Sequence, residues 1–233
     1  MAFIDIDFAK PTLCSALGLV EHNLSSSATV KIQAFSDAAR TDEVYSKEIN
    51  LYEPIIGWGE SGWGNVGWGG YPDEEDLEFY PRVTQTFFLD ESLVYLYWRV
   101  SFDNGDDEFF LGRMFLCNHW EASVNLSHGF SLELVDPSNT VESRGGQFWT
   151  DVREQYYLAQ FDLKAIQDTE IWGRFLNLSK HCGVRKDFIV RLIDLHEKQR
   201  AFTTFYGRFT KVPKAQNRTD KLYSSKFIIR EVV

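Results

Sequence analysis

The chain has 233 residues, of which 44% are hydrophobic and 15% aromatic, and its formal net charge is −10. These values predict one or two globular domains with a real core. No apolar stretch reaches the roughly 18 residues of a membrane-spanning helix, and the first residues lack the pattern of a signal peptide, so we expect no membrane span. Cys14, Cys117 and Cys182 show no metal-ligand spacing, and buried free thiols are expected.

Strand patterns dominate the first half of the chain. Alternating or aromatic-rich stretches predict strands over residues 4–8, 28–35 and 93–102. Pro11 is expected to end the first strand. The sequence Asp-Asn-Gly-Asp at 103–106 is typical of a hairpin turn, so residues 109–116 are expected to return as the partner of the preceding strand. Strands with turns between them and almost no helix predict a β-sandwich or jelly roll.

Between these strands lies the sequence GWGESGWGNVGWGG, in which Trp58, Trp63 and Trp68 recur every five residues. A spacing of five places side chains on one side of neither a helix nor a strand, and glycine weakens both. We predict an ordered loop of turns, at residues 57–70, next to a solvated acidic run. Its rings and Tyr71 are candidates for a ligand site or a protein interface; a cap over the protein's own core is an equal alternative.

The charge changes sign along the chain. Residues up to 143 contain 7 Lys and Arg against 24 Asp and Glu, whereas the residues from 144 onward contain 17 against 10. This break predicts a domain boundary near 143, and it allows copies of the protein to meet acidic to basic. Nucleic-acid binding is not expected, because the basic residues are scattered and no recognised motif accompanies them.

The second half predicts a mixed pattern. Five strands are expected, over residues 147–152, 156–163, 188–195, 202–212 and 222–232. One helix is predicted over 169–181, with Asp168 or Thr169 as its N-cap and Gly183 as its stop. Its apolar face consists of Ile171, Trp172, Phe175 and Leu178. The order β-β-α-β-β-β predicts a five-stranded sheet crossed by one helix, or a small sandwich flanked by it.

Few residues suggest chemistry. His22 and His119, beside asparagines, have the groups to bind a sugar hydroxyl or a metal, but fixing a loop through backbone hydrogen bonds is the favoured interpretation. The acidic residues at 103–108 lack the spacing of a calcium loop, which favours a solvated turn. No nucleophile, zinc, phosphate-binding or dinucleotide motif is present. We therefore expect no enzymatic activity, no metal and no cofactor.

Two segments of the first half, LGLVEHNLSSSATVKIQAF and YLYWRVSFDNGDDEFFLGRMFLCNHW, resemble a galactose-binding-like jelly roll of the form carried by tail proteins of long-tailed bacteriophages. The likeness covers about the first 135 residues, and it is carried by HNLS with the following ATV strand and by the LGR-x-F-L segment before Asn118-His119-Trp120. It implies a jelly-roll domain at 1–143, in which His22, His119 and Trp120 are candidates for ligand or protein contacts. The Trp-Gly-rich insertion is also similar to phage tail-tip proteins.

Residues 144–233 resemble the ring-forming domain of distal tail and tail-tube-related subunits. The likeness rests on an RGG start, the strand and helix order, FIVRL, YGR and a closing IIRE strand. It implies a mainly β protein, with a β-sandwich ring domain containing one helix after the jelly roll. In many distal tail proteins the ring domain comes first, so the order is reversed here.

This resemblance implies a structural virion protein of a siphovirus-type tail tip, made in the host cytoplasm. Copies would close a ring, a hexamer, that joins the tail tube protein to hub, baseplate and fibre proteins. The candidate inter-subunit residues are Arg144, Arg153, Arg208 and Arg230, since arginine anchors interfaces. The alternative is a lectin-like tail module whose tryptophans stack on host surface glycans.

Overall fold

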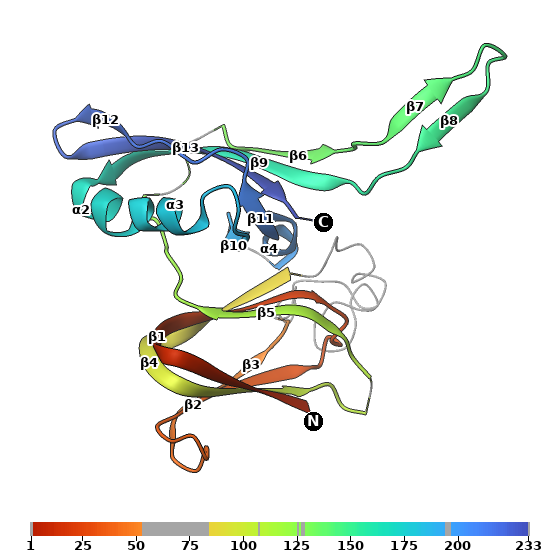
Figure 1. Cartoon of the computed structure of the whole chain (residues 1–233). Helices are drawn as coiled ribbons and strands as arrows, with labels where there is room; N and C mark the ends of the chain where they lie inside the picture. Colours follow the sequence, from red (N-terminus) through yellow and green to blue (C-terminus); the bar gives the residue numbers. More distant parts are fainter. Residues whose placement is uncertain are drawn as a thin grey trace, which may run out of the picture. The chain divides into compact units, whose positions relative to one another are not determined.

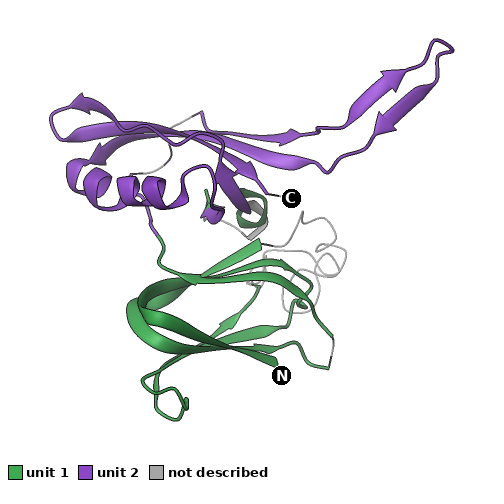
Figure 2. Ribbon diagram, in the orientation of Figure 1, with its two compact units in different colours: residues 1–119, 191–205 green, residues 120–190, 206–233 purple. Residues whose placement is uncertain are grey.

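The computed structural model describes residues 2–52, 84–106, 108–124, 126, 129–193 and 197–232. The fold is mainly β with one helix of 15 residues, which confirms the predicted fold class. Two compact units are present: unit 1 (residues 1–119 and 191–205) and unit 2 (residues 120–190 and 206–233) (Figure 2). The units divide at residues 119 and 120, whereas the charge break predicted 143. The sign of the charge along the sequence depends on which side chains face solvent, whereas the unit boundary depends on which strands pair with each other.

Unit 1 contains one five-stranded antiparallel sheet in the order β3-β2-β4-β1-β5 (Figure 1). Its strands are β1 (Ala2–His22), β2 (Thr29–Phe35), β3 (Glu43–Asn50), β4 (Thr84–Asp103) and β5 (Leu111–Cys117). The turn after β4 is present, with Gly105 at φ 65°. However, β5 pairs with β1 and not with β4 as predicted, because β1 and β2 already occupy both edges of β4.

Strand β1 runs through Pro11, so the prediction that this proline ends the strand is wrong. The register of β1 on β4 shifts between Asp7 and Thr12, and again between Cys14 and Ala16. Proline has no N–H to donate to a neighbouring strand, and an irregular stretch tolerates this loss. Pro11 therefore marks a break in register rather than the end of the strand.

The core of unit 1 is formed by the inward positions of its central strands. In β2, Val30, Ile32 and Ala34 are fully buried, while the residues between them are half-exposed. Trp98 and Phe102 of β4 are also buried, and they belong to the same cluster as the apolar side chains of β1. Period-2 alternation thus places one face of the sheet in the core.

Unit 2 is built on a sheet with the path β10-β11-β13-β9-β6, to which β12 adds by pairing with β13. The bounds are β6 (Ser131–Val135), β9 (Tyr156–Gln167), β10 (Phe188–Arg191), β11 (Thr204–Phe209), β12 (Gln216–Thr219) and β13 (Leu222–Glu231). A short helix α4 (Glu197–Thr203), assigned to unit 1, precedes β11 and was not predicted. It takes the first two residues of the strand expected over 202–212, and β10 ends at Arg191, within the strand expected over 188–195.

One helical segment of unit 2 combines α2 (Asp168–Glu170), η1 (Ile171–Phe175) and α3 (Leu176–Cys182). Gly183, at φ 52°, ends it as predicted. The N-cap is Gln167 without a side-chain cap, so neither Asp168 nor Thr169 caps it. Trp172, which was predicted on the apolar face, is instead 60% exposed. Its Nε1 donates to Asp168 Oδ1 at 2.7 Å.

The core of unit 2 is aromatic and centres on Phe227 of β13. Its ring stacks on Phe161 at a centroid distance of 4.9 Å, and it packs edge-on against Phe175 of the helical segment at 5.6 Å. Phe209 and Trp120 complete the cluster at 6.2 and 6.5 Å. Such contacts add to the free energy gained by burying apolar area.

A separate two-stranded sheet extends from unit 2, where β6 and β9 leave the main sheet. It consists of β7 (Asn139–Glu142) and β8 (Phe148–Asp151), which pair only with each other. Figure 1 shows this hairpin projecting from the rest of unit 2. We call residues 139–151 the arm.

Candidate interaction surface

Four predicted site residues, Trp58, Trp63, Trp68 and Tyr71, lie outside the described residues. Their proposed role in a ligand site or interface therefore stays a sequence prediction.

His22 lies at the buried end of β1, and only 4% of its surface is exposed. The backbone N–H of Leu24 donates to its Nδ1 at 3.4 Å. Burial lowers the pKa of His22 to about 4, and the nearby Gln85 side chain opposes this shift only in part. His22 is thus neutral at pH 7 and holds the chain as it leaves β1. Its burial leaves it unavailable as a surface ligand for a sugar.

His119 follows β5 and is held against the irregular part of β1. Its backbone N–H donates to Ser15 Oγ at 3.0 Å, while its Nδ1 lies 2.7 Å from the same oxygen. Ser15 Oγ also donates to Asn118 Oδ1 at 3.0 Å, and Phe88 packs on the imidazole at 4.6 Å. Ser15 is 2% exposed, so this serine–histidine contact is closed to a substrate and fixes the end of β5.

Trp120 begins unit 2 and packs into its aromatic core. Its Nε1 donates to Glu170 Oε1 at 2.9 Å, and the same oxygen accepts the backbone N–H of Ser123 at 3.1 Å. Ser123 Oγ donates to the other carboxylate oxygen. One carboxylate therefore fixes residues 120–123 onto the helical segment, which is a structural role for the predicted contact residue.

The four predicted inter-subunit arginines are dispersed over unit 2. Arg144 lies exposed in the turn of the arm. Arg153 pairs with Asp151 at 2.9 Å at its base. Arg208 pairs with Asp187 at 2.8 Å. Arg230 lies 4.0 Å from the centroid of the Tyr156 ring. Arg153, Arg208 and Arg230 thus have partners within their own unit. For Arg144 no such contact is described.

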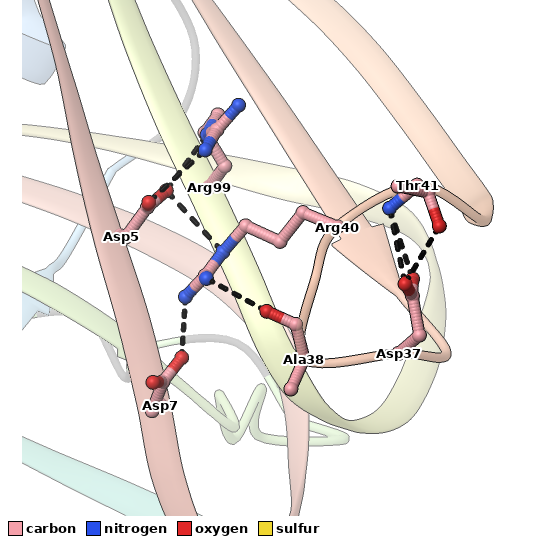
Figure 3. A network of polar contacts seen from close by, with 7 residues as sticks. All are labelled: Asp5, Asp7, Asp37, Ala38, Arg40, Thr41 and Arg99. Atoms are coloured by element: carbon pink, nitrogen blue, oxygen red, sulfur yellow. Dashed lines mark hydrogen bonds and ion pairs between the residues drawn. The ribbon is translucent and has the colours of Figure 1, made fainter.

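Unit 1 carries an ordered polar network on its surface (Figure 3). Asp5 accepts two hydrogen bonds from Arg99, at 2.7 and 3.0 Å, and also pairs with Arg40 at 3.3 Å. Arg40 extends to Asp7 as well. The bond from Arg99 is the main reason that the pKa of Asp5 is lowered. This network fixes the loop between β2 and β3 onto β1.

The arm exposes large apolar side chains. Val141 is 58% exposed, Phe148 and Trp149 are each 69% exposed, and the adjoining Val152 is 81% exposed. Val141, Phe148 and Trp149 belong to a ribbon whose two strands pair only with each other. Several large apolar side chains exposed together on one element indicate a candidate site of protein association.

Hydrogen bonds fix the arm at both ends. At its base, Arg153 N–H donates to Ser138 Oγ at 2.9 Å, and Ser138 N–H donates to Asp136 Oδ1 at 2.9 Å. In its turn, Ser143 N–H donates to Gln147 O at 2.8 Å. Gly146 adopts φ 78°, a conformation that favours glycine. These hydrogen bonds hold the hairpin of the arm in a defined conformation, in which its apolar side chains are exposed.

Sequence reasoning predicted the strand at 147–152 but did not identify its aromatic residues as site candidates. The usable pattern was two adjacent aromatics, Phe148 and Trp149, in a strand. Neighbouring side chains of a strand point to opposite faces, so both faces are apolar. A strand with one buried face would show alternation instead.

The two ends of the chain differ in charge. The first 119 residues contain 7 Lys and Arg against 20 Asp and Glu, and residues 206–233 contain 7 against 2. Cys14 and Cys182 are buried free thiols as predicted, whereas Cys117 is exposed. Burial raises the pKa of Cys14 to about 12, which removes thiolate reactivity at neutral pH. No cluster of three metal-binding side chains occurs within the described ranges.

Comparisons of the chain with protein-family models, with curated proteins and with solved structures found no match. Among the residues placed by the structure, no helix has the length and apolar character needed to cross a membrane. The arm is the feature on which a function can be argued.

Proposed function

We propose that the protein is a structural assembly subunit whose copies join into a ring, a hexamer, at the distal end of a bacteriophage tail. Its work is mechanical rather than catalytic. The exposed arm is the observation on which the proposal rests. The partner that covers the arm is a second copy of this chain.

The arm needs a partner for physical reasons. An isolated two-stranded hairpin is marginally stable in water, and its free strand edges invite further pairing. Phenylalanine and tryptophan are enriched in protein interfaces, and tryptophan is a frequent anchor once it is buried. Covering the arm with a neighbouring subunit satisfies both requirements.

Charge favours another copy of the same chain as that neighbour. The acidic first 119 residues and the basic residues 206–233 attract one another between copies. An arm that reaches a different surface on its neighbour makes a heterologous contact, and heterologous contacts form a ring when the rotation between copies closes. The tail-tip location, the hexamer and the tube, hub, baseplate and fibre partners rest on the resemblance described above.

The test compares the wild-type chain with an arm-shortened variant in which Asn-Gly replaces residues 136–155. Val135 and Tyr156 are paired, so a two-residue turn joins β6 to β9 in the existing register. Sedimentation velocity is expected to give a ring-sized multiple of the 27.0-kDa chain for the wild type and a monomer for the variant. A wild type that stays monomeric at every concentration overturns the proposal.

Two further measurements separate the location from the assembly. Antibodies against the chain are expected to label the tail tip of virions in electron micrographs; absence of label there overturns the tail location but not the ring. A monomer that binds a glycan column, and loses binding after Trp58→Ala, Trp63→Ala and Trp68→Ala, supports the lectin-like alternative instead.

A further inference from the structure

The register of the arm places an aromatic side chain on each of its two faces. Val141 pairs with Trp149, and Glu142 pairs with Phe148. Paired residues in an antiparallel ribbon share a face, and successive residues alternate between faces. Val141 and Trp149 therefore lie on one face, and Phe148 lies on the other. The Oγ1 atoms of Thr140 and Thr150, 3.1 Å apart, share the face of Phe148.

Both faces are open in the single chain. Trp149 and Phe148 are equally exposed, at 69% each, and Val141 is 58% exposed. A ribbon that lies flat on one surface buries one face and leaves the other in water, where polar residues are favoured. Phe148 shares its face with Glu142 and the two threonines, but a largely exposed aromatic ring among polar residues is not what a water-facing side favours.

We propose that the arm is inserted between two surfaces of neighbouring copies, so that Trp149 with Val141 is buried on one side and Phe148 on the other. This inference rests on the proposed function, since the occupants are copies of this chain. Asp151 and Arg153 neutralise each other through their ion pair at the base of the arm. The insertion therefore depends on apolar contact, while the charge difference between the two ends of the chain orients the copies.

The test uses one substitution on each face, with a polar control on the same face. Trp149→Ser is compared with Asn139→Ser, and Phe148→Ser is compared with Thr150→Ser. All four positions are exposed on the arm, so none of the changes removes a core contact. Assembly is measured as a function of concentration by sedimentation velocity and mass photometry on the full chain, and circular dichroism checks the fold.

Each aromatic substitution is expected to raise the dissociation constant of assembly at least about tenfold, because buried aromatics are typical interface anchors. The controls are expected to change it less than about threefold. If only one face responds, two-sided insertion is overturned while assembly through the arm stands. If the wild type assembles and neither face responds, the arm is not the contact. If the wild type never assembles, the proposed function itself fails.

Discussion

The aromatic cluster around Phe227 and the aromatic pair of the arm belong to the same unit but lie in opposite environments. Phe227 is 3% exposed and has aromatic neighbours on several sides, whereas Phe148 and Trp149 are mostly exposed. The cluster supplies the folding energy of unit 2 from within one chain. In the proposed assembly, the arm contributes binding energy when another subunit covers it. The same residue types are buried within the chain in one region and exposed in the other.

The largest expected effect comes from the cluster. Phe227→Ala removes a ring from the centre of the core and is expected to lower the free energy of unfolding by about 3–5 kcal/mol, through lost burial and the cavity left behind. Urea unfolding followed by tryptophan fluorescence measures this change.

The matched control is Phe148→Ala, at a concentration where the wild type is monomeric. This change is expected to alter the free energy of unfolding by less than about 0.5 kcal/mol, because the side chain is exposed in the single chain. A large loss from Phe148→Ala would mean that the arm packs within its own chain, and the contrast between the two regions would disappear.

The next prediction concerns the pH dependence of the free energy of unfolding, which we expect to come from His22 of unit 1 above pH 4 and not from either aromatic region of unit 2. The folded pKa of His22 is about 4, against a usual value of 6.5. Between these values the unfolded chain binds a proton that the folded chain does not, so stability falls as the pH falls from 6.5 to 4. The loss at pH 4 is expected to reach about 3 kcal/mol.

The control for this pH effect is His22→Asn, which keeps an acceptor near the N–H of Leu24 and cannot be protonated in this range. Its unfolding free energy is expected to change little between pH 6.5 and 4. Below pH 4 both proteins are expected to lose stability, because Asp5 and Asp136 also have lowered pKa values. An equal slope in both proteins above pH 4 contradicts the assignment to His22.

A smaller effect defines the border of the aromatic cluster. Glu170→Ala removes the acceptor for Trp120 Nε1 and for the N–H of Ser123, and is expected to cost about 2 kcal/mol. The fluorescence of Trp120 should shift as the ring loosens. Glu133→Ala, which changes an exposed glutamate of β6 in the same unit, is the control. If Glu170→Ala has no effect on stability, Trp120 is held by packing alone.

The sequence predicts the regular parts of the fold but not its pairing. Apolar and aromatic patterns locate β2, β5, β8 and β13 to within a few residues. They do not give the partner of β5, which depends on which edge of β4 is already occupied. The analysis also misses β3, β7 and β12, which are largely polar, and β6, which is only five residues long.

The candidate site is predicted less well than the fold. The importance of His22, His119 and Trp120 as residues with specific contacts is readable from their polar groups, but their burial depends on distant strands. The arm is readable only in part: two adjacent aromatics indicate a strand with two apolar faces, but the exposure of Phe148 and Trp149 depends on whether a second layer covers them. The presence or absence of such a layer is a property of the tertiary structure, and periodicity alone does not report it.

The smallest expected effect concerns an exposed segment that, unlike the arm, is held by its own contacts. Arg40 joins the loop between β2 and β3 to Asp5 and Asp7, and its side chain is 12% exposed. Arg40→Ala is expected to lower the free energy of unfolding by about 1 kcal/mol, since ion pairs near the surface contribute little.

Arg40 also adopts φ 55°, which favours glycine. Arg40→Gly is therefore expected to cost less than Arg40→Ala, although both lose the same ion pairs. An equal cost in urea unfolding would show that the loop shifts its backbone when the ion pairs are lost. Hydrogen exchange should then rise in that loop and remain unchanged in the arm.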